Sequence, residues 1–143
     1  MPHFIPTQFP HIASKLKGRV AVITGGCGFI GSHLAHALAA SGATVRVLDD
    51  LSGGFESNLA PARDATKASG GGVEFIKASI LDDAALRKAI AGSDFIFHQA
   101  ALVSVPESVE KPEKCLSVNV EGTQRVLLAA KDAKALEKKE KRV

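Results

Sequence analysis

The sequence predicts an α/β fold in which a parallel four-stranded sheet, in the strand order 3-2-1-4, carries flanking helices as one half of a doubly wound domain. Four short apolar runs of the kind that forms buried parallel strands alternate with segments whose apolar residues recur at helical spacing. A glycine-rich turn separates the first run from the first helix. Strands alternating with helices imply right-handed crossovers, and these set the strand order.

Each element follows from a local pattern. The predicted strands cover residues 19–24, 44–48, 73–78 and 95–97. The first predicted helix, 29–40, ends at Ser41-Gly42, and the second, 84–91, begins after the N-cap candidate Asp82 and ends at Gly92. A long helix is expected from Pro112, a residue suited to the first helical turn, to about residue 131. The polar, glycine-rich stretch 52–72 is expected to be mostly loop, as is the segment leading through Pro106.

The chain's 143 residues suit one domain. We expect an N-terminal arm over 1–18, a truncated dinucleotide-binding domain over 19–133 and a basic tail over 134–143. The net charge of +3 comes entirely from residues 131–142, which hold six basic and three acidic side chains, so the domain has no basic face for nucleic acid. No apolar run predicts a signal peptide or a membrane span. The two cysteines form no CxxC pair, and neither a metal site nor a compartment other than the cytoplasm is expected.

The turn after the first strand, TGGCGFIGS over residues 24–32, satisfies two dinucleotide-binding spacings at once. GxGxxG is met by Gly26, Gly28 and Gly31, and GxxGxxG is met when Gly25 replaces Gly26. Glycines let the main chain turn sharply and approach a pyrophosphate, while the following helix points its free N–H groups at the anion. A tight turn without a ligand is the structural alternative, but the strand before and the helix after favour cofactor binding.

An acidic pair closes the second strand. Asp49 lies eighteen residues beyond Gly31, where a carboxylate can accept hydrogen bonds from the adenosine ribose hydroxyls. A 2′-phosphate would meet the negative charges of Asp49 and Asp50, and no arginine follows directly. The predicted cofactor is therefore NAD rather than NADP, although Asp50 can equally be a solvated loop residue.

Four segments resemble one family. TGGCGFIGSHLAHAL, VLDDLSGG, FHQAALVSVPESVEKP and NVEGT resemble the NAD-dependent epimerase/dehydratase family, which belongs to the extended short-chain dehydrogenases/reductases. The likeness runs from residue 19 to about 132 and concerns the N-terminal part of the family only. It implies a partial Rossmann fold. The segment SVPESV is most similar to that of UDP-glucose and UDP-N-acetylglucosamine 4-epimerases and of related glucuronate enzymes. This resemblance leaves the sugar substrate undecided.

The resemblance also implies a set of cofactor-binding residues. Phe29 and Ile30 would offer backbone amides to the pyrophosphate, and Asn119 would steady the floor of the site, unless it is simply an exposed polar residue of its helix. Two positions depart from the family: Ser79 stands where an aspartate often lies beside adenine, and Asp50 replaces an asparagine. The complete expected set is Gly25, Gly28, Phe29, Ile30, Gly31, Asp49, Asp50, Ser79, Ile80, Gln99, Ala100, Ala101 and Asn119.

Catalysis is a different matter, because the sequence contains no tyrosine. The resemblance implies that proton transfer in the family is carried out by a Tyr-x-x-x-Lys pair, in which the lysine lowers the pKa of the tyrosine phenol. We therefore expect no catalytic residue here, and an NAD-binding portion that is inactive alone and meets a UDP-sugar only if completed by a catalytic half. The alternatives are a non-catalytic NAD-binding module, a module assembled with a partner chain, and a decayed remnant. The edge of the fourth strand is a candidate for pairing with a partner or with itself.

Overall fold

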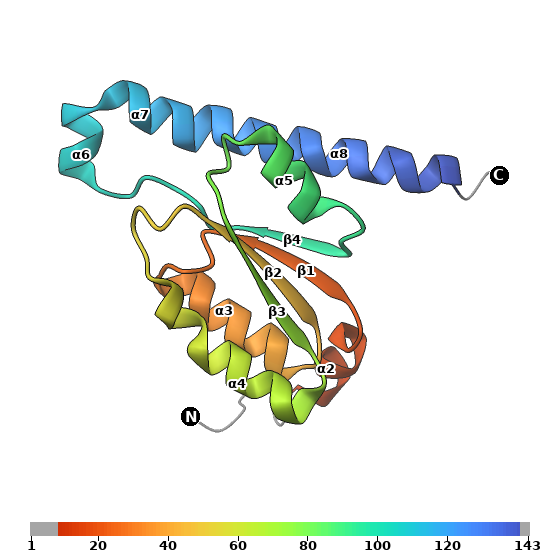
Figure 1. Cartoon of the computed structure of the whole chain (residues 1–143). Helices are drawn as coiled ribbons and strands as arrows, with labels where there is room; N and C mark the ends of the chain where they lie inside the picture. Colours follow the sequence, from red (N-terminus) through yellow and green to blue (C-terminus); the bar gives the residue numbers. More distant parts are fainter. Residues whose placement is uncertain (1–8, 141–143) are drawn as a thin grey trace.

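The sheet is the framework of the molecule. The computed structural model describes the backbone of residues 9–140 and the side chains of 9–134. Four parallel strands pair in the order β3-β2-β1-β4, which confirms the predicted topology (Figure 1). Their bounds lie within about one residue of those expected. They are β1 (Val20–Thr24), β2 (Thr44–Asp49), β3 (Gly72–Lys77) and β4 (Phe95–His98).

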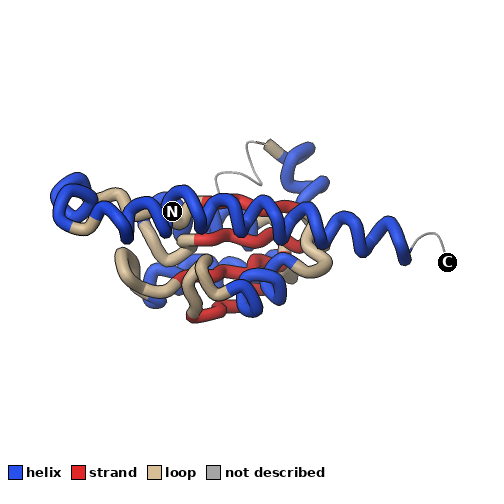
Figure 2. The backbone as a smooth tube through the Cα atoms, turned by 90° about the horizontal axis from the view of Figure 1, so that it is seen from above, coloured by secondary structure: helices blue, strands red, loops and turns tan. Residues whose placement is uncertain are grey.

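Helices cover both faces of this sheet (Figures 1 and 2). On one face α3 and α4 pack over a core that includes Ile23, Val45 and Leu59; on the other, α5 and α8 enclose a core around Val22, Leu48 and Leu86. The helices are α2 (Pro10–Leu16), α3 (Phe29–Ala40), the 3₁₀ helix η1 (Glu56–Leu59), α4 (Ala60–Ser69), α5 (Asp83–Ile90), α6 (Val105–Glu110), α7 (Pro112–Leu116), the π-helix η2 (Ser117–Gly122) and α8 (Thr123–Glu140).

The predicted helices are present. Both bounds of α3 match the expected 29–40, and Asp82 caps α5 by accepting a hydrogen bond from Ala85 N at 3.1 Å. The long C-terminal helix starts at Pro112, but it passes through the wide turn of η2 before it continues as α8. Since α8 reaches Glu140, it runs unbroken across the expected boundary at 133/134, and residues 141–143 of the basic tail lie outside the described chain.

Two expected loops are wrong, because both contain helix. Within 52–72, η1 and α4 form and bury Leu59, Ala62 and Ala65, which recur every three residues on the side that packs against α3. The segment through Pro106 is already helical from Val105, because the Ser104 hydroxyl accepts a hydrogen bond from Glu107 N at 3.2 Å and caps α6. Part of the N-terminal arm is also helical, as α2, and it packs Leu16 against the core. In residues 9–140 no helix combines the length and apolar character needed to span a membrane.

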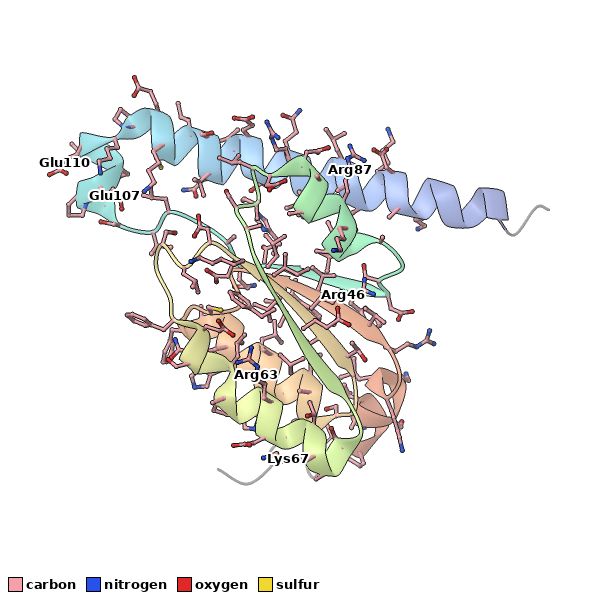
Figure 3. All side chains as sticks on the ribbon, viewed as in Figure 1. Arg46, Arg63, Lys67, Arg87, Glu107 and Glu110 are labelled. Atoms are coloured by element: carbon pink, nitrogen blue, oxygen red, sulfur yellow. The ribbon has the colours of Figure 1, made fainter. Side chains whose placement is uncertain are left out.

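Arg46 joins the sheet to the end of α5 (Figure 3). Its guanidinium donates to the carbonyls of Ala89 at 3.1 Å and Ala91 at 2.6 Å, and its Nε lies 3.2 Å from Glu74 Oε2. The last carbonyls of a helix have no partner inside the helix and carry partial negative charge. The Arg46 side chain is 23% exposed and its bond to the Ala89 carbonyl is partly buried, whereas Glu74 is 58% exposed.

We expect Arg46→Ala to lower the free energy of unfolding by about 1–3 kcal/mol, since it leaves helix-end carbonyls without their charged donor. Urea denaturation followed by circular dichroism measures this change. Lys67→Ala is the control, because Lys67 pairs with Asp64 in full solvent and such pairs add little stability. Equal losses in the two variants would contradict the assignment of Arg46 as a helix-end donor.

Candidate functional site

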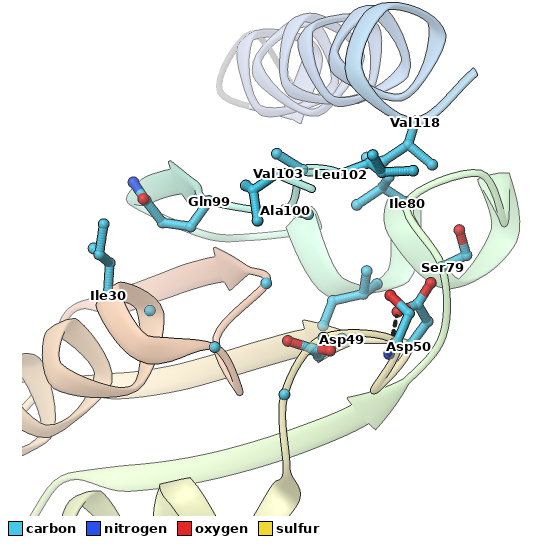
Figure 4. A pocket seen from close by; sticks show the side chains of 18 of the residues that line it. Ile30, Asp49, Asp50, Ser79, Ile80, Gln99, Ala100, Leu102, Val103 and Val118 are labelled. Atoms are coloured by element: carbon cyan, nitrogen blue, oxygen red, sulfur yellow. Dashed lines mark hydrogen bonds between the residues drawn. The ribbon is translucent and has the colours of Figure 1, made fainter. Parts of the chain in front are cut away.

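The carboxyl ends of β1, β2 and β4 border a cavity of about 620 Å³ (Figure 4). This is where ligands bind in open parallel sheets, at the point where successive crossovers leave to opposite faces. The structure brings all but one of the expected site residues together here. The lining includes Gly25, Gly28, Phe29, Ile30, Gly31, Asp49, Asp50, Ser79, Ile80, Gln99, Ala100 and Ala101. Asn119 borders an adjoining cavity of about 380 Å³ instead.

Gly25 lets the turn after β1 fit between its two neighbouring strands. It has a φ of +69°, and its N–H donates to the Leu48 carbonyl of β2 at 2.9 Å. A Cβ atom there would lie 2.6 Å from the backbone nitrogen of Ala100, which follows β4. Both the dihedral angle and the space therefore exclude a side chain at this position.

The first turn of α3 faces the cavity without a cap. Gly28 is the N-cap and has no side chain to accept from the helix, and Ser32 N is the first amide to bond back, to the Gly28 carbonyl at 3.0 Å. The amides of Phe29, Ile30 and Gly31 precede it in the helix and border the cavity. Free amides at the positive end of a helix form an anion site, so this end of the cavity fits a pyrophosphate.

Asp49 ends β2 as a nearly buried carboxylate that is 8% exposed. One oxygen accepts from Cys27 N and the other from Leu51 N, both at 2.8 Å. Each oxygen keeps a further lone pair, which can accept a ribose hydroxyl. Leu51 takes a φ of +62°, an uncommon angle for leucine that the turn around Asp49 imposes.

Asp50 plays a smaller structural part. It is exposed and lines the cavity, and its Oδ1 accepts from Ser52 N at 2.9 Å. Opposite it, Lys114 of α7 binds Glu107 of α6 at 2.7 Å, and both of these side chains border the cavity. The pKa of Lys114 is raised, first by Glu107 and to a lesser extent by Asp50. Asp50 and the Lys114–Glu107 ion pair thus border the same cavity.

The end of the cavity beside β3 is an apolar slot (Figure 4). Ile80, Leu102 and Val118 border it, and Ile80 is 4% exposed. The Ser79 hydroxyl oxygen accepts from Leu81 N at 3.1 Å and keeps its proton to donate. A flat apolar base fits such a slot, with a hydroxyl rather than a carboxylate at its edge.

Asn119 holds the segment that follows β4. Its Oδ1 accepts from Leu102 N at 2.8 Å, and its Nδ2 donates to the Leu102 carbonyl at 3.0 Å. The amide side chain therefore faces Leu102 and not only solvent. This geometry is compatible with a role in steadying the floor of the site, and the direct assignment of the thirteen residues to cofactor binding remains a prediction.

Sequence reasoning missed four residues that shape the site. Asn58 lies in the stretch expected to be loop and donates to the Cys27 carbonyl at 2.8 Å. It therefore holds the glycine turn at the same residue whose N–H binds Asp49. Burial, with Asp49 as the next cause, raises the pKa of the Cys27 thiol to about 12, so it stays protonated. The other three, Thr24, His98 and Thr123, form one hydrogen-bonded chain, and burial lowers the pKa of His98. Only spatial contact reveals this chain.

The arrangement suits a long ligand with an anionic middle, a diol and an apolar base. Among the described side chains, those of residues 9–134, no cluster of histidine, cysteine, aspartate and glutamate has the make-up of a metal site. The cavity offers backbone amides, the desolvated carboxylate of Asp49 and apolar side chains, and Asp50, Glu107 and Lys114 add charged groups to its lining.

Comparison with known proteins places this cavity in context. Residues 21–139 match the model of the NAD dependent epimerase/dehydratase family. A UDP-glucose 4-epimerase of Mycolicibacterium smegmatis is 43% identical over 111 residues, which cover 77% of this chain and 34% of that protein. The chain thus spans about a third of the length of this relative.

Solved structures agree with the fold. An epimerase from the methanogen Methanothermobacter thermautotrophicus superposes with a TM-score of 0.76 at 34% identity, covering 91% of this chain and 36% of that one. A UDP-glucose 4-epimerase of Thermus thermophilus in complex with NAD superposes with a TM-score of 0.67 at 32% identity, covering 80% and 34%. With the family model matching most of its length, this chain belongs to the NAD-dependent epimerase/dehydratase family.

Proposed function

We propose that this chain is the NAD-binding portion of a nucleotide-sugar epimerase or dehydratase of the UDP-sugar 4-epimerase type. One observation carries the proposal: a single cavity has the uncapped N-terminus of α3 beside the desolvated carboxylate of Asp49. The relatives support it, since the Thermus protein was solved with NAD. Which sugar the whole protein takes stays open, and a cytoplasmic location is part of the proposal.

The cofactor lies along the cavity in one direction. The amides of Phe29 and Ile30 would hold its pyrophosphate, Asp49 would accept from its adenosine ribose, and the slot at Ile80 would take its adenine. NAD is preferred over NADP because a 2′-phosphate would face the carboxylates of Asp49 and Asp50. When bound, NAD supplies a hydride acceptor; the residues of this chain bind it and orient it.

The chemistry on the sugar belongs to groups that this chain lacks. It contains no tyrosine, so the Tyr-x-x-x-Lys pair of the family has no counterpart among its residues. We therefore place the UDP-sugar and the proton transfer in a catalytic half that would complete the site. The chain supplies the cofactor half.

A second candidate function is a non-catalytic or partner-assembled NAD module. Within residues 9–140, β4 pairs with β1 alone and leaves its other edge open, where Phe95 is 40% exposed. An open apolar edge favours pairing with another strand. In this second candidate function, the strand that pairs there comes from a partner chain or from a second copy of this chain.

Calorimetric titration tests NAD binding, with Asp49→Asn and Asp50→Asn as a matched pair. We expect Asp49→Asn to weaken NAD binding about tenfold or more and to narrow the preference for NAD over NADP, because charged hydrogen bonds to the ribose are lost. Asp50→Asn keeps the oxygen that accepts from Ser52 N and should change NAD affinity little. Folded wild-type chain that shows no heat of binding would overturn the proposal, as would equal effects of the two substitutions.

Activity gives an independent test. We expect the purified chain, supplied with NAD and UDP-glucose or UDP-N-acetylglucosamine, to form no epimer above the rate in buffer, since it has no phenol to exchange the proton. Chromatography of the nucleotide sugars after long incubation measures this. Epimer in proportion to the amount of chain added would refute the assignment of catalysis to another half.

The open edge can be probed with Phe95→Lys. A lysine at a sheet edge opposes pairing with another strand, so this variant should lower any self-association seen for wild type by sedimentation velocity. Leu127→Lys, at an exposed position of α8, is the control for added charge. Self-association that survives Phe95→Lys would rule out the β4 edge as its cause.

A further inference from the structure

Three sequence motifs each contain a polar residue to which cofactor binding gives no role. Thr24 opens the glycine turn, His98 precedes Gln99 at the end of β4, and Thr123 closes NVEGT at the start of α8. In the structure the three side chains are hydrogen-bonded in series. His98 Nδ1 lies 2.6 Å from the Thr24 hydroxyl, and its Nε2 lies 2.9 Å from the Thr123 hydroxyl. One ring therefore connects β1 with α8.

The hydrogen-bond donors fix which ring nitrogen carries the proton. The fully buried Thr24 hydroxyl oxygen lies 3.3 Å from Ala100 N, which donates to it, and 3.2 Å from Gln99 N, whose hydrogen it shares with the Thr24 carbonyl at 3.0 Å. A hydroxyl oxygen has two lone pairs, so Thr24 has only its proton left for His98, and Nδ1 must accept it. The ring proton then sits on Nε2 and is donated to Thr123, whose own proton goes to the Asn119 carbonyl at 2.7 Å. The other tautomer would leave no proton between Nε2 and the Thr123 hydroxyl, because Thr123 already donates its proton to the Asn119 carbonyl.

This series of hydrogen bonds ends at Asn119, whose side chain binds the segment that follows β4. Thr24 binds the amides of Gln99 and Ala100 at the start of the segment, and the Asn119 side chain binds Leu102 at its end. His98 and Thr123 connect these two anchors. Between the anchors lies Ala101, which borders the cavity together with its neighbours.

We infer that His98, as its neutral Nε2–H tautomer, is a positioning residue that fixes the segment Gln99–Leu102 against the cofactor. The inference rests on the proposed NAD site for its functional consequence. The inference adds that Thr24, His98 and Thr123 join their three motifs in one hydrogen-bonded unit. Loss of the Thr123 hydroxyl, or a second proton on the His98 ring, therefore loosens the segment Gln99–Leu102, although neither His98 nor Thr123 borders the larger cavity.

Protonation is unfavourable where His98 lies. The groups around it are Thr24 from β1, Thr123 from α8, Asn119 from η2 and Ile30 from α3, and the adjoining cavity has no charged side chain in its lining. Burial lowers the pKa of His98 below its ordinary 6.5. The neutral ring thus stabilises the fold fully above pH 6.5, and this contribution is lost as the pH falls from there toward the folded-state pKa.

The test combines a measurement without cofactor and one with it. In the ligand-free chain, imidazole ¹⁵N chemical shifts at pH 7.5, assigned with His98→Gln, should show a protonated Nε2 and a bare Nδ1. Thr123→Val removes the hydroxyl at nearly constant volume and should speed amide hydrogen exchange at Ala100 and Leu102, whereas Thr123→Ser should not. Thr66→Val is the control, because Thr66 donates to the Arg63 carbonyl in α4 in the same way but far from the cavity.

In the cofactor measurement, Thr123→Val should weaken NAD binding about fivefold, as expected for one hydrogen bond, with Thr123→Ser and Thr66→Val near wild type. Wild-type affinity should also fall on acidification below the folded-state pKa, and His98→Gln should lose that dependence. A protonated Nδ1, or unchanged exchange and unchanged affinity in Thr123→Val, overturns the inference. If wild type binds no NAD while tautomer and exchange behave as expected, the proposed cofactor fails and the hydrogen-bonded unit stands.

Discussion

Hydrogen bonding of the central strand β1 to β2 on one side and β4 on the other is the interaction on which the site depends. The register sets Thr24 opposite both Leu48 and His98, so the three strands end at the same level. The glycine turn leaves β1 between two strand ends, and Gly25 bonds to one of them while touching the other. The helix that follows can then aim its first amides at the space above the sheet.

Sequence patterns predicted the parts of the fold that depend on neighbours along the chain. The bounds of α3 were predicted because a glycine turn precedes periodic apolar residues and Ser41-Gly42 follows them. Helix α4 was missed because its buried residues are small, Ala62 and Ala65, in a polar stretch, although Pro61 in its first turn was a usable signal. Helix α6 was also missed, since the segment through Pro106 was expected to be loop, although Ser104 and Glu107 stand in capping-box spacing at its start.

The site divides in the same way. Glycines and Asp49 were found because they lie at fixed distances from strand ends, which the chain itself displays. Thr24 and His98 are 74 residues apart, and His98 and Thr123 are 25 apart, so their contact depends on the completed sheet. Asp49 belongs to both groups: its position was predicted, but its bonds to Cys27 N and Leu51 N were not. Through these bonds the Asp49 carboxylate joins the glycine turn after β1 to the turn after β2.

The π-helix η2 lies where one long helix changes from contacting the segment after β4 to packing against the core. Its wide turn changes the phase between Asn119, which faces the segment after β4, and Val126 and Ala129, which pack into the core. A π segment is a local widening within an otherwise α-helical ladder, comparable to one inserted residue. A substitution of Asn119 would therefore act first on the segment after β4, whereas substitutions of Val126 or Ala129 would act on the core.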